Sequence, residues 1–329
     1  MPSGEDELIA KYFKPLATAP GALGLTDDAA AYAPPEGHDL VLTTDAIVSG
    51  IHFLPGDPPD TVARKALRVN LSDLAAKGAR PAGCLLTLAL PESTGDDFLH
   101  PFAAALHSDC DLFACSLLGG DTVRTDGPLW ASITAFGVLP RGSMVRRAGA
   151  GPGDIVMITG TVGDSALGLR LLLEPELAAQ WSLDDDDAAH LVGRYRVPQP
   201  RNAMADAVRM LASAAMDVSD GLVGDLAKLC GASGVSARIG VARLPLSAAA
   251  AKAFKAAPGL IEAIATGGDD YEILASVSRD KVAAFRDGAR AAGIAVTEIG
   301  EIVAGREPPQ LIDVDGALLT FARDSFSHF

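Results

Sequence analysis

Strand-like apolar runs alternate with helical segments through residues 39–139, and this order limits the folds that the chain can adopt. Residues 60–77 carry apolar side chains at helical spacing and stop at Gly78, and residues 95–110 show a second helical pattern. Four runs predict strands: residues 39–48, 83–90, 112–118 and 129–139. The resulting order, β-α-β-α-β-β, favours an α+β layer with helices on one face of a mixed sheet.

A turn-rich stretch at residues 146–154 separates this region from the rest of the chain. We place the domain boundary there, so residues 1–145 and 146–329 form two predicted domains, as a length of 329 residues also favours. Strands of the second half are predicted at residues 155–159, 235–240, 271–277 and 294–303, with an extended segment at 214–219. Helices are predicted at residues 164–174, 185–195, 200–213, 221–232 and 279–292, and within 247–266. This half is therefore predicted to be α/β or α+β.

The charge balance excludes several partners. A formal net charge of −15 and a pI near 4.7 argue against nucleic acid or an anionic membrane. No apolar run approaches the roughly 18 residues of a membrane-spanning helix, and the acidic N-terminus lacks the apolar region of a signal peptide. The four cysteines (Cys84, Cys110, Cys115 and Cys230) show no CxxC pairing, so we expect them to be reduced and buried. These features predict a soluble, cytoplasmic protein.

Five short acidic clusters are the main functional signal. Each combines carboxylates with hydroxyls or glycines beside an apolar segment: residues 26–28, 43–45, 70–73, 119–122 and 216–221, with a related cluster at 267–271. Carboxylates that converge inside a fold must be neutralised, because unpaired buried charge is costly. Mg²⁺ shared with the phosphates of a substrate is a common neutraliser. Since both halves carry clusters, a shared cleft between the domains is the economical arrangement.

Each cluster also has a structural explanation when it is taken alone. Asp27 and Asp28 can form a turn or cap a helix, and residues 43–45 can form a turn at the end of a strand. Asp73 can pair with Lys77 on a helix surface, although this pair does not explain the other polar residues of that helix. Taken one at a time, these clusters leave both interpretations open.

Two further clusters also allow both a structural and a functional interpretation. Residues 119–122 can form a hairpin turn, or their glycines can bring backbone amides close to a phosphate while Asp121 holds a metal. Ser219 or Asp220 can cap the helix that follows. Together with Asp217, they can instead form a metal–phosphate site at the beginning of that helix.

The familiar phosphate-binding loops are absent from the sequence. There is no GxxxxGK[ST] sequence and no protein-kinase HRD or DFG set. The glycines of residues 149–153 precede a predicted strand, where a dinucleotide loop would follow one, so we reject that interpretation. The acidic run 184–187 is explained by the dipole of the helix that it begins. His52, shortly after residues 43–45, is either a site residue or an exposed loop histidine.

The order of the motifs resembles that of the thiamine-monophosphate kinase family, which belongs to the aminoimidazole-ribonucleotide-synthetase-like group. The resemblance extends from residue 4 to His328 and Phe329. It rests on Gly4-Glu5, Leu8-Ile9-Ala10-Lys11-Tyr12-Phe13, Thr26-Asp27-Asp28-Ala29, Thr43-Thr44-Asp45, Gly50-Ile51-His52-Phe53, residues 70–79, 119–122, Arg147 with 149–154, 217–222 and 267–272. One motif would be weak evidence, but the full ordered series is specific.

The resemblance implies a fold, an activity and a set of ligands. It implies an N-terminal α+β domain that forms a homodimer around a shared barrel-like sheet, and a C-terminal α/β domain. The implied reaction is phosphorylation of thiamine monophosphate to thiamine diphosphate by ATP, with several Mg²⁺ ions. Metal-binding positions of the family fall on Asp28, Thr43, Thr44, Asp45, Asp73, Asp121, Asp217 and Asp220. ATP-binding positions fall on Gly120, Asp121, Arg147 and Ser219, and thiamine-phosphate positions on His52, Asp269 and Phe326.

The chain departs from the family pattern at two substrate positions. The family usually has Gly-Gly-Glu-Asp-Tyr where this chain has Asp269, so one acidic side chain is shorter here. Phe326 can stack on an aromatic ring of the substrate but lacks the Tyr hydroxyl or Trp N–H of the usual ending. These changes concern the contacts to the substrate and leave the predicted metal positions intact.

The chemistry of the implied reaction needs no general base. A phosphate monoester has a second pKa of about 6, so its attacking oxygen is already anionic at neutral pH. Mg²⁺ ions, with Arg147 as a phosphate clamp, would relieve the repulsion between two phosphates and hold them in line. We expect direct transfer, without a phosphorylated enzyme. The alternatives are another ATP-using synthetase of the same fold group and a non-catalytic nucleotide-binding regulator.

Overall fold

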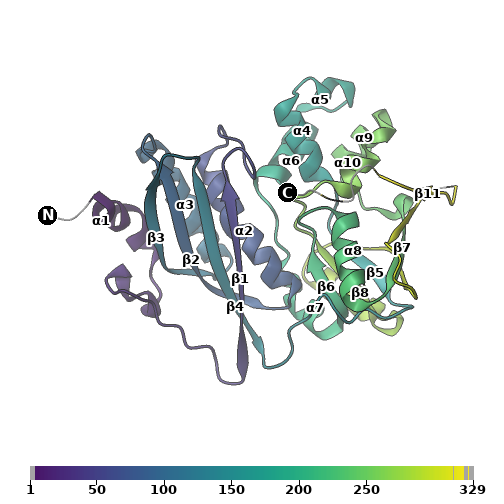
Figure 1. The fold of residues 1–329 in the computed structure, drawn as a ribbon, viewed down its shortest axis with the longest axis horizontal. Coiled ribbons are helices and arrows are strands. Elements are labelled where there is room, and N and C mark those ends of the chain that lie inside the picture. Colours follow the sequence, from purple (N-terminus) through teal and green to yellow (C-terminus); the bar gives the residue numbers. More distant parts are fainter. Residues whose placement is uncertain (1–3, 314, 322–324, 326–329) are drawn as a thin grey trace. The chain divides into compact units, whose positions relative to one another are not determined.

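The fold was obtained as a computed structural model, which describes residues 4–313, 315–321 and 325. The chain divides into two units, coloured along the sequence in Figure 1. The first comprises residues 1–74 and 79–143, and the second comprises residues 75–78 and 144–329. Each unit has its own sheet and its own hydrophobic core.

The first unit is built on an open, four-stranded mixed sheet. Its strands lie in the order β1-β4-β2-β3: β1 is His38–Val48, β2 Arg80–Pro91, β3 Ser116–Thr125 and β4 Trp130–Pro140. β4 pairs antiparallel with both β1 and β2, whereas β2 pairs parallel with β3. The predicted mixed sheet is therefore confirmed for this unit.

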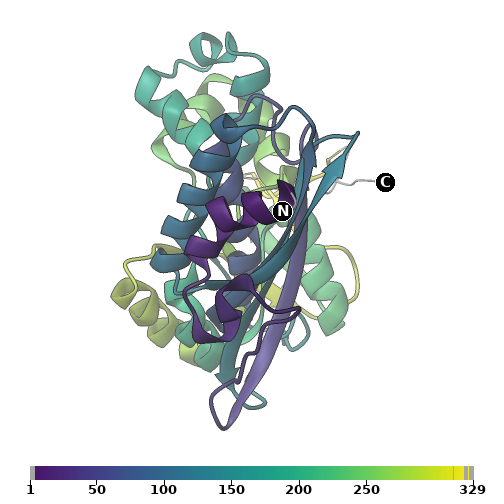
Figure 2. The same ribbon diagram turned by 90° about the vertical axis from the view of Figure 1, so that its left-hand side faces the viewer.

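Two helices, α2 (Pro59–Ala76) and α3 (Asp96–Leu112), cover one face of this sheet, as Figure 2 shows. Because side chains alternate along a strand, Val41 of β1 and Ile133 of β4 face these helices. There they join a core that includes Leu71 of α2. The predicted layer of helices on one face is present.

The opposite face of the sheet, which we name the open face, carries exposed apolar side chains. Leu40, Leu42, Leu85 and Val123 are exposed, Leu42 by 64%. They share one face because the strand register and the alternation of side chains place them on the same side of the sheet. Large exposed apolar groups of this kind commonly mark interaction surfaces.

Short helical segments precede the sheet and were not predicted from the sequence. They are α1 (Gly4–Leu8), the π-helical turn η1 (Ile9–Phe13), and the 3₁₀ segments η2 (Lys14–Leu16) and η3 (Pro20–Leu25). Each is too short to produce a clear helical period. Tyr12 and Phe13 are nevertheless buried, so tertiary packing fixes this segment.

The second unit contains a seven-stranded mixed sheet in the order β11-β10-β7-β9-β5-β8-β6. The strands are β5 Ile155–Thr159, β6 Ala212–Asp217, β7 Ser236–Gly240, β8 Ile273–Val277, β9 Val296–Val303, β10 Gln310–Ile312 and β11 Leu318–Leu319. β7 and β10 pair in parallel, and the other neighbours pair antiparallel.

Helices occupy most of the connections in this unit. They are α4 Asp164–Leu173, α5 Leu177–Gln180, α6 Asp185–Arg196, α7 Ala205–Leu211, α8 Leu222–Ser233, α9 Ala248–Ala256, α10 Ile261–Thr266 and α11 Val282–Ala291. Single 3₁₀ turns lie at η4 Asn202–Met204, η5 Val241–Arg243, η6 Pro258–Leu260 and η7 Arg279–Lys281. Asp184 and Asp187 form a capping box at the start of α6, which confirms a local helix-end role for that acidic run.

One strand prediction was wrong in a way that affects the site. Residues 112–118 were predicted as a strand, but Leu112 is the last residue of α3 and is 66% exposed. The strand β3 begins later, and residues 119–122 lie inside it instead of forming a hairpin turn. Gly120 permits this pairing, because a Cβ atom at this position would lie 1.8 Å from the carbonyl oxygen of Leu86 in β2.

Two other predicted elements are shorter than expected. The predicted helix at residues 200–213 is reduced to η4 and α7, because β6 already begins at Ala212. The predicted strand at residues 271–277 begins only at Ile273. All four cysteines are free and buried, as predicted. Across the described residues, every helix is too short or too polar to cross a membrane.

Candidate active site

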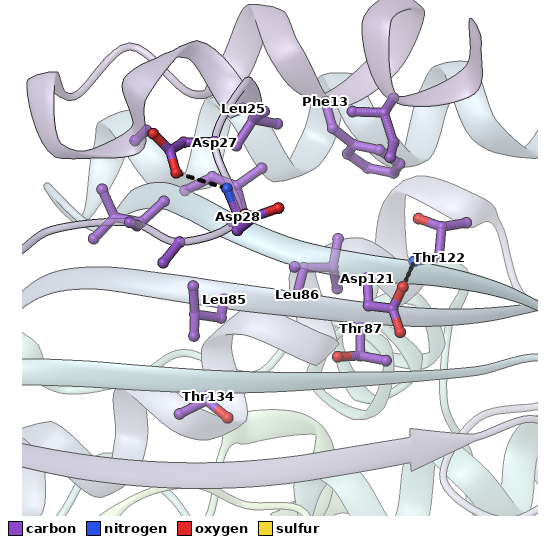
Figure 3. A pocket seen from close by; sticks show the side chains of 18 of the residues that line it. Phe13, Leu25, Asp27, Asp28, Leu85, Leu86, Thr87, Asp121, Thr122 and Thr134 are labelled. Atoms are coloured by element: carbon purple, nitrogen blue, oxygen red, sulfur yellow. Dashed lines mark hydrogen bonds between the residues drawn. The ribbon is translucent and has the colours of Figure 1, made fainter. Parts of the chain in front are cut away.

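A pocket of about 690 Å³ lies between the open face of the first unit's sheet and the N-terminal segment (Figure 3). Phe13, Leu25 and Tyr32 give it an apolar lining, and Asp28 and Asp121 add carboxylates. Burial raises the pKa of the Tyr32 phenol. The pocket thus combines apolar surface with acidic groups, as sites for small organic phosphates commonly do when metal ions take part.

The strand register explains how the polar groups reach this pocket. Asp121 of β3 lies opposite Thr87 of β2, and both line the pocket. Thr134 of β4 lines it too, and its hydroxyl lies 3.1 Å from that of Thr44, its register partner on β1. Thr44 and Asp121 therefore belong to the same face of the sheet. Asp28 reaches the pocket from the loop that follows η3.

Thr43 and Asp45 lie on the other face of β1, because alternate residues of a strand point to opposite sides. The Thr43 hydroxyl donates a hydrogen bond to the Asp73 carboxylate of α2. The Asp45 backbone amide donates to the buried side-chain oxygen of Asn70 at 3.0 Å. These contacts explain why polar residues occupy α2. They also rule out a strand-end turn at residues 43–45, which lie within β1.

His52 is held in a defined orientation after β1. Its Nδ1 accepts a hydrogen bond from the Val48 backbone amide at 3.0 Å, so the neutral imidazole carries its proton on Nε2. The buried Lys65 ammonium donates to the His52 carbonyl at 2.8 Å. His52 is half-buried, so the interpretation as an exposed loop histidine does not apply.

In the second unit, residues 217–220 form a tightly fixed turn between β6 and α8. The backbone amides of Ser219 and Asp220 both donate to the fully buried carboxylate of Asp225, each at 2.9 Å. Burial raises the pKa of Asp225, although its ion pair with Lys228 opposes this shift. Ser219 and Asp220 do not cap α8, which begins after Gly221 without a side-chain cap. The helix cap, one of the two interpretations of this cluster, is therefore absent.

Lys228 connects two carboxylates of this turn. Its ammonium lies 2.5 Å from Asp220 and 2.8 Å from Asp225. Burial disfavours the charged ammonium, but the bonds to both carboxylates outweigh this effect and raise the pKa of Lys228. Asp217 lies at the end of β6 and is 4% exposed. The turn thus contains the buried carboxylate of Asp217 and the carboxylate of Asp220, which is paired with Lys228.

Arg147 is exposed, and its backbone is fixed to the same unit. Its carbonyl accepts a hydrogen bond from the Ser233 hydroxyl at 3.1 Å, and the Arg146 carbonyl accepts one from Ala215 of β6 at 3.0 Å. The guanidinium is thus carried by a fixed backbone beside β6. Asp269 belongs to the same unit and is half-buried. Phe326 lies outside the described residues.

The predicted metal ligands offer carboxylate and hydroxyl oxygens, which are the donors that Mg²⁺ prefers. Among the described residues, no three or more His, Cys, Asp and Glu side chains converge closely enough to hold a metal by themselves. Mg²⁺ usually binds through one or two carboxylates together with waters and substrate phosphates. Pairs such as Thr43 with Asp73 fit that kind of site, and they do not form an all-protein cage.

Sequence reasoning missed several residues that shape the site. Asp225 was not singled out, although it holds the amides of the 217–220 turn. Nor were Tyr32 and Thr87, which line the pocket. The position of Asp225, in the first turn of the helix after an acidic motif, was the only local signal. Thr87 reaches the pocket through strand register and Tyr32 through the path of the loop before β1, and the sequence reveals neither.

Both units match known domain families. Residues 26–139 match the AIR synthase related protein, N-terminal domain, and residues 151–309 match the AIR synthase related protein, C-terminal domain. Over 308 residues the chain is 46% identical to a thiamine-monophosphate kinase of Caulobacter vibrioides, covering 92% of this chain and 85% of that protein.

Two solved structures resemble this one along most of the chain. One is a thiamine-monophosphate kinase from Stenotrophomonas maltophilia K279a, with a TM-score of 0.81 and 35% identity over 95% of this chain and 96% of that one. The other is AaThiL complexed with AMPPCP and TMP, with a TM-score of 0.78 and 30% identity over 90% of this chain and 89% of that one.

Proposed function

Because this chain belongs to the thiamine-monophosphate kinase family, we propose that it transfers the γ-phosphoryl group of ATP to thiamine monophosphate, which yields thiamine diphosphate and ADP. The observation that carries this proposal is the 46% identity to a thiamine-monophosphate kinase along 92% of the chain. A structural relative binds AMPPCP and TMP together, which supports an ATP-like ligand and a thiamine phosphate as the two substrates.

The pocket on the open face suits the nucleotide. Its apolar side, with Phe13, Leu25 and Tyr32, can enclose an adenine ring. The carboxylates of Asp28 and Asp121 can hold the metal ions that are bound to the phosphates. Gly120 is proposed as a further ATP-binding residue, because it lines the pocket beside Asp121. From the second unit, Ser219 and Arg147 are proposed to contact the ATP phosphates.

We propose several Mg²⁺ ions as cofactors. The proposed ligands are Asp28, Thr43, Thr44, Asp45, Asp73, Asp121, Asp217 and Asp220, which all supply the oxygen donors that Mg²⁺ prefers. When bound, Mg²⁺ would neutralise the charge of the phosphates and hold them for in-line transfer. The paired state of Asp220 with Lys228 keeps one of these carboxylates neutralised when no metal is bound.

The thiamine monophosphate is proposed to contact His52, Asp269 and Phe326. The proton of the neutral His52 ring is on Nε2, and an imidazole N–H suits a phosphate or ring-nitrogen acceptor. An oxygen of the substrate phosphate forms the new bond to the γ-phosphorus of ATP, and the bond to the β,γ-bridging oxygen breaks. The attacking oxygen is already anionic, so none of these residues acts as a general base.

We further propose a homodimer that pairs through the open face, and a cytoplasmic location. The exposed Leu40, Leu42, Leu85 and Val123 of an open sheet support the dimer. A barrel-like sheet shared by two copies would cover these side chains. The use of ATP and the four free cysteines support a cytoplasmic location.

The purified protein, incubated with ATP, Mg²⁺ and thiamine monophosphate, should form thiamine diphosphate and ADP in equal amounts. The two products are measured separately by chromatography. Asp121→Asn should lower kcat/KM by about 100-fold, because it removes a charge that holds the metal–phosphate group. Asp126→Asn is the matched control, since Asp126 is an exposed carboxylate of the same β3–β4 region outside the pocket lining.

The outcomes separate the alternatives. Nucleotide binding without ADP formation would favour a non-catalytic regulator. A rate of ATP consumption that does not depend on thiamine monophosphate would favour another ATP-using synthetase of this fold group. Recovery of a stable phosphorylated protein after incubation with ATP would contradict direct transfer between the substrates.

A further inference from the structure

The segment Gly267–Glu272, between α10 and β8, carries Asp269 on an unusual backbone. Asp269 has a φ of 68° and Tyr271 a φ of 51°, both in the left-handed region. Side chains other than glycine seldom adopt this region, and Tyr pays more strain there than Asp. Strained residues of this kind persist only where the surroundings hold them, and they cluster at functional sites.

Backbone hydrogen bonds to residues 217–220 hold this segment from one side. The amides of Asp269 and Tyr271 donate to the carbonyls of Ser219 and Val218, both at 2.8 Å. The amide of Val218 in turn donates to the Glu272 carbonyl at 2.9 Å. The segment with the proposed substrate residue is thereby fixed to the turn that holds proposed metal and ATP residues.

Two buried carboxylates of the same segment, those of Asp270 and Glu272, also fix it to its surroundings. The Asp270 carboxylate accepts the Gly163 amide at 2.9 Å and 3.0 Å to its two oxygens. Glu272 is fully buried, and its carboxylate binds Arg194 at 3.0 Å and the Nε of Arg201 at 2.6 Å. The alternate residues, Asp269 and Tyr271, are half-buried.

Asp269 and Tyr271 also contact each other. The Tyr271 hydroxyl donates a hydrogen bond to a carboxylate oxygen of Asp269 at 3.2 Å. A short Asp side chain has two rotatable bonds, and this contact restricts the direction of its carboxylate. Both residues of this contact have a left-handed backbone.

We propose that Tyr271 is a positioning residue, whose hydroxyl orients the Asp269 carboxylate toward the cationic thiamine part of the substrate. This inference rests on the proposed function and adds a residue that acts through Asp269. It offers a purpose for the backbone strain, because the strained segment holds the hydroxyl within hydrogen-bonding distance of the carboxylate.

Tyr271→Phe tests the inference, since it removes one oxygen atom and keeps the aromatic ring. We expect the KM for thiamine monophosphate to rise about tenfold, as for the loss of a hydrogen bond to a charged group. The KM for ATP and kcat should stay within about twofold of the original protein. Tyr12→Phe is the matched control, because the Tyr12 hydroxyl also donates to a carboxylate, that of Asp96 in the first unit.

A double-mutant cycle separates positioning from general structural damage. In an Asp269→Ala background, Tyr271→Phe should cause no further rise in the KM for thiamine monophosphate. An equal rise in both backgrounds would show that Tyr271 acts independently of Asp269 and would overturn the inference. So would an unchanged KM in the single variant. If the unaltered protein forms no thiamine diphosphate, the proposed function fails and this inference fails with it.

Discussion

Adjacent carboxylates in the 267–272 segment meet opposite surroundings. Asp269 is half-buried beside the Tyr271 hydroxyl, whereas Asp270 is 1% exposed and binds the Gly163 amide. Burial raises the pKa of Asp270 well above its ordinary value of 3.8, with support from the nearby Asp164 and in spite of the Gly163 amide. One sequence motif thus contains both a proposed ligand and a structural acid.

The raised pKa of Asp270 predicts a specific pH dependence of stability. Its contribution is fully present below the ordinary pKa and is lost as the pH rises through the raised, folded-state pKa. The free energy of unfolding of the original protein, relative to Asp270→Asn, should therefore fall with rising pH. Urea unfolding at a series of pH values above 4 measures this difference. A difference that is flat or rises with pH would contradict the assignment.

At this scale residue types and spacing indicate candidate site residues, but they do not indicate the partners of those residues. The clusters at residues 43–45 and 217–220 were identified from residue types and spacing alone. The bonds from Thr43 to Asp73 and from Ser219 to Asp225 join residues on different elements or turns, so they depend on the folded chain. Arg194 and Arg201, which neutralise the buried Glu272, gave no local signal for the same reason.

Helices α2 and α3 are joined by a buried ion pair. The Asp109 carboxylate of α3 is fully buried and lies 2.6 Å from both the Arg64 and the Arg68 guanidinium of α2. Arg68 is itself 5% exposed and stacks 5.3 Å from the Phe113 ring centroid. Such a pair adds little net stability, but removal of one partner leaves an uncompensated buried charge.

Asp109→Ala should therefore lower the free energy of unfolding by about 3–5 kcal/mol. Chemical denaturation of the protein, followed by circular dichroism, measures the loss. Asp111→Ala is the control on the same helix, because Asp111 is exposed and should change stability by less than about 0.5 kcal/mol. Similar losses in the two variants would refute the role of the buried pair.

The residue that follows the end of α3, Ala114, has a backbone conformation that is unfavourable for alanine. Ala114 follows the helix with a φ of 51°, the left-handed conformation that usually falls to glycine. Ala114→Gly should stabilise the protein by about 1 kcal/mol, since the side chain is exposed and its removal loses no packing. Thermal unfolding measures the gain. Ala104→Gly, at an exposed position inside α3, should instead destabilise by about 1 kcal/mol.

Elements with a clear period were predicted well, and short ones were not. The spacing of apolar residues located α2 and most strands of both sheets. The short segments before β1 and the strands β10 and β11 have too few residues to establish a period. The third strand was predicted too early, at residues 112–118, because the apolar end of α3 and the apolar beginning of β3 form one nearly continuous apolar run in the sequence.

The open face of the first unit predicts the assembly of the whole molecule. If two copies pair through it, sedimentation should give about twice the mass of the 33.7 kDa chain. Leu42→Asp places a charge on this face, on its edge strand β1, and should convert the protein to monomers. Leu173→Asp is the control, since Leu173 is 60% exposed on α4 of the second unit. A monomeric original protein would refute the proposed dimer.

At the scale of the molecule, the mixed sheet of the first unit, the α/β or α+β class of the second and the family resemblance followed from the order of segments and motifs. The sequence did not predict the strand order β11-β10-β7-β9-β5-β8-β6, because periodicity identifies strands without naming their neighbours. Nor did it predict that Thr44 and Asp121 share a face while Thr43 and Asp45 lie on the other. That division depends on register, which is a property of paired strands.

The position of β5 in the sheet has a consequence for the folding of the chain during translation. β5 pairs only with β8 and β9, and the hydrogen bond from the Ile273 amide to the Thr159 hydroxyl spans 114 positions. The first strand of the second sheet to be synthesised, which is apolar except for Thr159, therefore stays unpaired until nearly all of its unit has been translated. Synthesis of this unit creates a prolonged window for aggregation, in which a chaperone would be most useful.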